Sequence, residues 1–175
     1  MIKKILLCGI ASLVLTTSAN AWLIDGDNYA GININVGAGK AEESTVFSQS
    51  VGIEFGRQMS PNFYGGIVAK YNIFSLKDTT LTRNKFIGTA AGVLEFKGGY
   101  TFTKSFMLYA TGGYAQGNGL NSAVLGGGAR YAFNRSSAFF VEYKQYNVLL
   151  ENVGGARHSS VLGSGVVGFQ FFLRY

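Results

Sequence analysis

His158 is the only histidine of the chain, and Ser160 stands two residues after it. A histidine beside a serine could act as the general base of an acyl hydrolase that attacks through the serine oxygen. Such a base needs a third group to orient it, and the nearest acid, Glu151, lies upstream across an expected loop. We therefore expect His158 to be a solvated loop residue and assign no catalytic residue. A hydrolase that uses His158 and Ser160 is kept as an alternative.

A second set of chemically useful residues consists of charged side chains that recur on one face of alternating segments. These residues are Glu54, Lys70, Glu95, Lys97, Arg130, Glu142, Lys144 and Arg174. If this face is enclosed, acids and bases should pair, because an unpaired buried charge is very costly. We expect a structural ion-pair network, and a small gated pore is the alternative.

Other chemistry finds little support. Asp25, Asp27 and Asn28 could contact Ca²⁺, but the rest of a Ca²⁺-binding loop is missing, so we expect a polar tail. Cys8 is the only cysteine and lies in a segment that we expect to be removed. We thus expect no metal site and no cofactor. The net charge is +6, but the basic residues are scattered, so we expect no nucleic-acid partner.

The first 21 residues have the pattern of a secretory signal peptide. Lys3 and Lys4 are followed by an apolar run over residues 5–15, and Ala19 and Ala21 form a site for signal peptidase. The apolar run is too short for a spanning helix, which needs about 20 apolar residues. We expect cleavage after residue 21, which leaves residues 22–175 as a single domain.

The remainder of the chain is rich in residues that favour strands. The full chain has 25 Gly, 14 Phe, 10 Tyr, a single Pro and only 14% charged residues. Apolar and polar residues alternate with period two, which predicts β-strands. We expect eight strands, at about 29–39, 46–59, 63–75, 85–102, 106–117, 122–134, 137–150 and 160–175. Segment 106–117 is ambiguous, because both of its faces are apolar or small.

Short and longer connections alternate between these segments. Residues 60–62, 103–105 and 134–136 form tight polar turns, and the connections at 40–45, 76–84, 118–121 and 151–159 are longer. This pattern predicts an all-β fold, an eight-stranded antiparallel up-and-down transmembrane barrel. A soluble β-sandwich or barrel would show the same alternation with its apolar face inward. Aromatic residues beside the tight turns favour the membrane protein, because such residues form girdles at the lipid boundary.

The last segment carries a more specific pattern. Phe169, Phe171, Leu173 and Tyr175 share one face, and the segment ends on an aromatic residue. This ending resembles the C-terminal β-signal of outer-membrane proteins, and residues 126–146 resemble a hairpin of small barrels of the OmpA/OmpX/Opa type. The resemblance implies location in the bacterial outer membrane, contact with its lipid, and recognition by the barrel-assembly machinery. No peptidoglycan-binding domain is expected after Tyr175, and the outer connections are shorter than adhesin loops.

We therefore expect an integral outer-membrane barrel with a structural or surface-interaction role and no catalysis. The alternatives are a low-conductance pore, suggested by the charged face, and a lipid-modifying enzyme at His158 and Ser160. The oligomeric state is left open.

Overall fold

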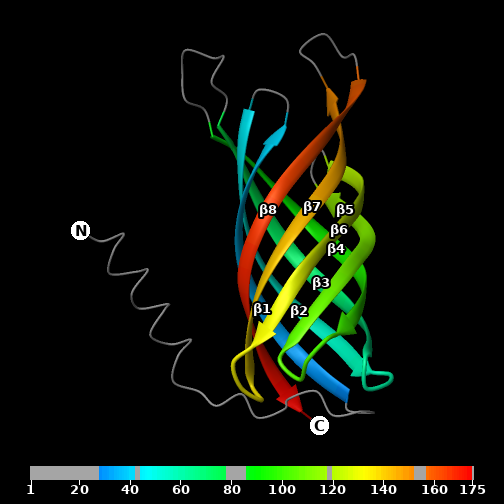
Figure 1. Ribbon diagram of the computed structural model, residues 1–175. Coiled ribbons are helices and arrows are strands. Elements are labelled where there is room, and N and C mark those ends of the chain that lie inside the picture. Colours follow the sequence, from blue (N-terminus) through cyan, green and yellow to red (C-terminus); the bar gives the residue numbers. More distant parts are fainter. Residues whose placement is uncertain (1–27, 42–43, 78–85, 118–119, 152–156, 175) are drawn as a thin grey trace, which may run out of the picture.

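Eight antiparallel strands close into a barrel in the computed structural model, which describes residues 28–41, 44–77, 86–117, 120–151 and 157–174. The strands are β1 (Asn28–Ala41), β2 (Ser44–Gln58), β3 (Phe63–Lys77), β4 (Phe86–Thr101), β5 (Phe106–Gly117), β6 (Leu120–Ala132), β7 (Ser137–Glu151) and β8 (Arg157–Arg174). Each strand pairs with the next in sequence, and β8 returns to pair with β1 (Figure 1). The predicted fold class is confirmed.

The expected signal peptide at residues 1–21, with Cys8, lies outside the described residues, as do Asp25 and Asp27. In the described part of the chain, no helix is long and apolar enough to cross a membrane.

On the side of the longer connections, several strands run further than the sequence pattern predicts. β1 extends to Ala41 and β2 begins at Ser44, so the expected connection at 40–45 is mostly strand. Likewise β6 begins at Leu120 and β8 at Arg157, inside the connections expected at 118–121 and 151–159. The physical reason is that backbone pairing continues wherever two strands stay in register, whether or not apolar side chains alternate there.

The barrel has an apolar outside and a polar inside. Ile34, Phe96 and Leu125 point outward and are 54%, 63% and 64% exposed. Glu54 and Arg130, which point inward, are 0% and 1% exposed. A soluble barrel has the opposite arrangement, so this polarity identifies a transmembrane barrel, whose closure leaves no strand edge unpaired in lipid.

The ambiguous strand β5 follows the same rule. Its burial alternates, with Met107, Tyr109 and Thr111 inside and Leu108 outside. Both faces carry apolar atoms because Met107 and Tyr109 point inward and pack in the lumen, while the outward residues face lipid.

Tight turns join the strands at one end of the barrel, where β8 also ends (Figure 1). In the turn after β2, Phe63 N–H donates to the Ser60 carbonyl at 3.3 Å. In the turn after β6, the Asn134 side-chain oxygen accepts from Ser136 N–H at 2.8 Å. Short turns mark the periplasmic end of outer-membrane barrels. Aromatic rings gather here, as where Tyr100 and Phe102 lie 4.9 Å apart between centroids.

Candidate functional site: the charged lumen

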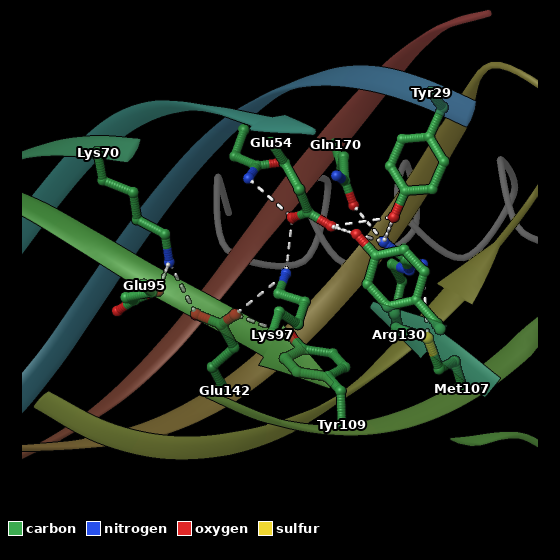
Figure 2. Close-up of polar contacts among 12 residues, drawn as sticks. Tyr29, Glu54, Lys70, Glu95, Lys97, Met107, Tyr109, Arg130, Glu142 and Gln170 are labelled. Atoms are coloured by element: carbon green, nitrogen blue, oxygen red, sulfur yellow. Dashed lines mark hydrogen bonds and ion pairs between the residues drawn. The ribbon is translucent and has the colours of Figure 1, made fainter. Parts of the chain in front are cut away.

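Seven of the eight charged residues expected on the inner face have described side chains, and all are buried in the lumen. They are Glu54, Lys70, Glu95, Lys97, Arg130, Glu142 and Lys144, and they come from β2, β3, β4, β6 and β7. The period-two geometry of a strand places each one inside, because inward residues alternate with outward residues. Figure 2 shows the polar contacts that link members of this set, among them Glu54, Lys97 and Arg130.

Glu54 is the centre of the periplasmic half of the network. Its carboxylate lies 2.7 Å from Lys97 Nζ and 3.1 Å from Arg130 Nη1. The hydroxyl groups of Tyr29 and Tyr64 donate to its Oε1 atom at 3.1 and 2.7 Å. A buried carboxylate with two cations and two hydroxyl donors has its charge and its lone pairs satisfied.

Glu95 and Glu142 form the other half of the network with two lysines. Lys70 Nζ lies 3.0 Å from Glu95 and 3.4 Å from Glu142. Lys144 Nζ lies 3.4 Å from Glu142 and donates to Glu95 Oε1. Lys97 connects the halves, because its Nζ atom is also 3.8 Å from Glu142. The described lumen charges thus belong to one continuous network.

The network includes neutral residues that the sequence analysis did not select. Tyr109 donates to Glu142 at 2.9 Å, and its ring centroid lies 4.5 Å from Lys97 Nζ. Gln170 Oε1 accepts from Arg130 at 3.0 Å, and Asn33 donates to Glu54 at 3.3 Å. Alternation along β1 and β8 places Asn33 and Gln170 on the inner face, whereas the two faces of the segment that holds Tyr109 are not distinguishable in the sequence.

Apolar layers lie above and below the charged network. On the side of the longer connections, the layer consists of Val46, Phe74, Ala91, Val93, Ala115, Val124, Tyr146 and Leu162. On the periplasmic side, it consists of Tyr29, Tyr64, Met107, Tyr109, Ala132, Ala138 and Phe172. An eight-stranded barrel is just wide enough for side chains to fill its interior. Side chains of the charged network and of these two layers thus occupy the described part of the lumen.

The remaining predicted residues are placed only in part. Arg174 ends β8 opposite Tyr29, but its side chain lies outside the described set. The expectation that His158 lies in a loop is wrong: its backbone belongs to β8, opposite Leu150. Ser160 follows on the same strand, and the side chains of both residues lie outside the described set.

The C-terminal pattern is also partly described. Phe169 and Phe171 point outward, with 41% and 51% exposure. The side chain of Leu173 and the whole of Tyr175 lie outside the described residues. Among the described residues, no cluster of potential metal ligands occurs.

Solved structures of similar fold are small bacterial outer-membrane barrels. Ail, the attachment invasion locus protein of Yersinia pestis, is 9% identical and matches with a TM-score of 0.51, over 86% of this chain and 100% of that chain. Neisserial surface protein A is 11% identical, with a TM-score of 0.50 over 82% of this chain and 96% of that one. The chain matches no family model and no curated protein.

The fold is thus that of the small eight-stranded outer-membrane barrels, as the sequence resemblance predicts. The apolar outer surface agrees with this class, and the chain is an outer-membrane β-barrel.

Proposed function

We propose that this protein is a closed, non-enzymatic barrel that acts through its outer surface, in envelope integrity or in contacts at the cell surface. The observation that carries this proposal is the filling of the described lumen, in which one ion-pair network lies between two apolar layers. Ions crossing it would have to separate buried charge pairs, and breaking such a pair costs about 3–5 kcal/mol.

The length of the strands supports a role outside the bilayer. A strand of 15 residues, such as β2, rises about 38 Å along the barrel axis at a tilt near 40°. The apolar band of outer-membrane barrels is only about 25 Å tall. The barrel wall therefore extends beyond the lipid on the side of the longer connections. Phe47 and Val161, near that end of β2 and β8, are 48% and 54% exposed and offer apolar contact area.

Planar-bilayer recording tests the closed lumen. Purified refolded protein should give no unitary currents, while protease protection of the same sample shows that barrels have inserted. A Glu54→Gln/Glu142→Gln variant, which removes two acids of the network, serves as the comparison for a weakened plug. Steady unitary currents from the wild-type protein would contradict the proposal and favour the small pore.

A lipid-modifying activity at His158 and Ser160 is tested separately. A histidine and a serine two residues apart are weak evidence of a catalytic pair, because the histidine also needs a third group to orient it, so we expect His158→Ala to leave lipid A composition as in the wild type. A change in lipid A acylation that depends on both His158 and Ser160 would instead establish the enzyme.

We further propose that the barrel-assembly machinery reads the final strand. The outward placement of Phe169 and Phe171 supports this, because residues on that face are available to a partner before the strand meets lipid. Replacing Phe171 with Ser should reduce the amount of protein that reaches the outer membrane, measured by fractionation, while Val161→Ser should not.

A further inference from the structure

A hollow of about 830 Å³ opens on the outer face of β2 to β5, in the part of the wall that faces lipid. Its floor consists of small residues on β3, β4 and β5, namely Gly65, Gly98, Ala110 and Gly112, and the Met59 side chain covers Gly65. Phe55, Ile67 and Phe96 form its wall on the side of the membrane centre. The hollow is thus mainly apolar and lies outside the lumen, so its occupancy does not depend on whether the lumen conducts.

The strand register gives the hollow a direction. Arg57 pairs with Gly65, Gly65 with Gly98, and Gly98 with Ala110, so these residues form one row across four strands. Arg57 is next to the last residue of β2, beside a periplasmic turn. Ala110 lies four residues inside β5, and the row therefore rises from the periplasmic boundary toward the middle of the bilayer.

The fold does not require glycine at Gly98 and Gly112 on the floor of the hollow. A Cβ atom added at Gly98 would meet nothing within 4 Å, and one at Gly112 would meet only Leu125 Cδ2, at 3.6 Å. Neither glycine has a positive φ that would exclude other residues. An apolar side chain at Gly98 would favour the strand, because glycine weakens strands. The room left there is consequently available to a group from outside the chain.

A polar pair stands at the periplasmic end of the hollow. Arg57 and Asn28 are partners across β1 and β2, and both are exposed and line the hollow. Within the described residues, Arg57 forms no ion pair. Arg and Asn side chains supply hydrogen-bond donors, and a guanidinium matches the geometry of a phosphate. The charge at this end therefore complements an anionic group at the height where lipid headgroups lie.

We propose that the hollow binds one phospholipid of the periplasmic leaflet, with an acyl chain along the floor and its phosphate at Arg57 and Asn28. The apolar floor, which slopes toward the bilayer centre, matches the acyl chain of such a lipid. The cation at the periplasmic end of the hollow matches its phosphate. A second copy of the chain fits less well. A two-fold interface would place the same patch against itself and bring Arg57 toward its own counterpart, where the two like charges would repel each other.

Native mass spectrometry of barrels extracted from vesicles tests the proposal. The vesicles contain phosphatidylglycerol and diacylglycerol, which differ in the phosphate headgroup. Gly98→Leu fills the floor. Gly92→Leu is its matched control, because Gly92 is exposed on the same strand away from the hollow and a Cβ there meets only the Gln116 carbonyl, at 3.8 Å. Arg57→Gln removes the cation, and Arg57→Lys retains it.

Wild type, Gly92→Leu and Arg57→Lys should retain one phosphatidylglycerol per barrel and no diacylglycerol. Gly98→Leu should retain about tenfold less, and Arg57→Gln about fivefold less, the factor expected for one cation near a membrane surface. Circular dichroism checks that each variant is folded. If Gly98→Leu fails to fold, the comparison of Arg57→Gln with Arg57→Lys still tests the proposed lipid site.

Equal retention by Gly98→Leu and Gly92→Leu, both folded, would overturn the proposal, as would equal retention by Arg57→Gln and Arg57→Lys. A lipid-free wild-type dimer that Gly98→Leu abolishes would also overturn it and would assign the hollow to a second copy.

Discussion

Lys97 Nζ and Glu54 Oε2 lie 2.7 Å apart across the lumen, although β3 separates their strands β4 and β2. Residues on the same wall that far apart would not normally meet. The contact exists because the closed wall curves both side chains toward the same axis (Figure 2). Lys97 then reaches Glu142 from the opposite wall as well, at 3.8 Å, and so joins the two halves of the network.

Replacing Glu54 with Gln should lower the free energy of unfolding by about 3–5 kcal/mol, because Lys97 and Arg130 would keep their charges and lose their shared anion. Urea unfolding in lipid vesicles measures this change. Lys104→Gln removes an exposed charge from the turn between β4 and β5 and should change the free energy of unfolding by less than about 0.5 kcal/mol. Equal effects of the two substitutions would show that the buried network contributes little.

Glu54 and Lys97 should be energetically coupled. In a double-mutant cycle with Glu54→Gln and Lys97→Met, we expect a coupling energy of about 1–3 kcal/mol, because the residues are in direct contact. A second cycle pairs Glu54→Gln with Lys144→Met, since Lys144 contacts Glu95 and Glu142 instead. Its coupling should be smaller than that of the first cycle, and the reverse order would mean that the described pairing is incorrect.

A charge on the lipid-facing side should cost stability according to depth. Leu94 is 52% exposed and lies well inside β4, so Leu94→Arg should lower the free energy of unfolding by about 2–4 kcal/mol. Met59 is 70% exposed beside a periplasmic turn, and Met59→Arg should cost only about 0–1 kcal/mol. Unfolding from lipid vesicles checks both, and a soluble barrel would tolerate the two substitutions equally.

Two strand glycines should differ in their tolerance of a methyl group. A Cβ atom at Gly113 would collide with the Leu94 carbonyl and with Glu95 Cα, which are backbone atoms that cannot rotate away. Gly113→Ala should therefore cost about 1–3 kcal/mol, the usual penalty of overpacking. Gly98→Ala meets open space and should be neutral or stabilising by up to about 1 kcal/mol. Refolding yield and urea midpoints in vesicles measure both variants, and similar losses would contradict this distinction.

The sequence by itself determined the number of strands, their approximate positions and, except in segment 106–117, the division of each strand into two faces. These properties are local, because the side chains of a strand alternate whatever surrounds it. The same local rule assigned Glu54 and Lys97 to one face before any contact was known. It could not fix the strand ends, because pairing at residues such as Ala41 and Arg157 depends on the neighbouring strand and not on an apolar pattern.

Only the tertiary structure decided which charged residues meet and which neutral residues join them. Closure of the barrel turns the hydroxyl groups of Tyr64 and Tyr109 onto Glu54 and Glu142, contacts that link strands distant in sequence. The hollow at Gly98 likewise depends on register, because its floor combines residues from three strands that are distant in sequence. Alternation along one strand determines which face of the wall a side chain lies on, whereas closure and register determine which residues it contacts.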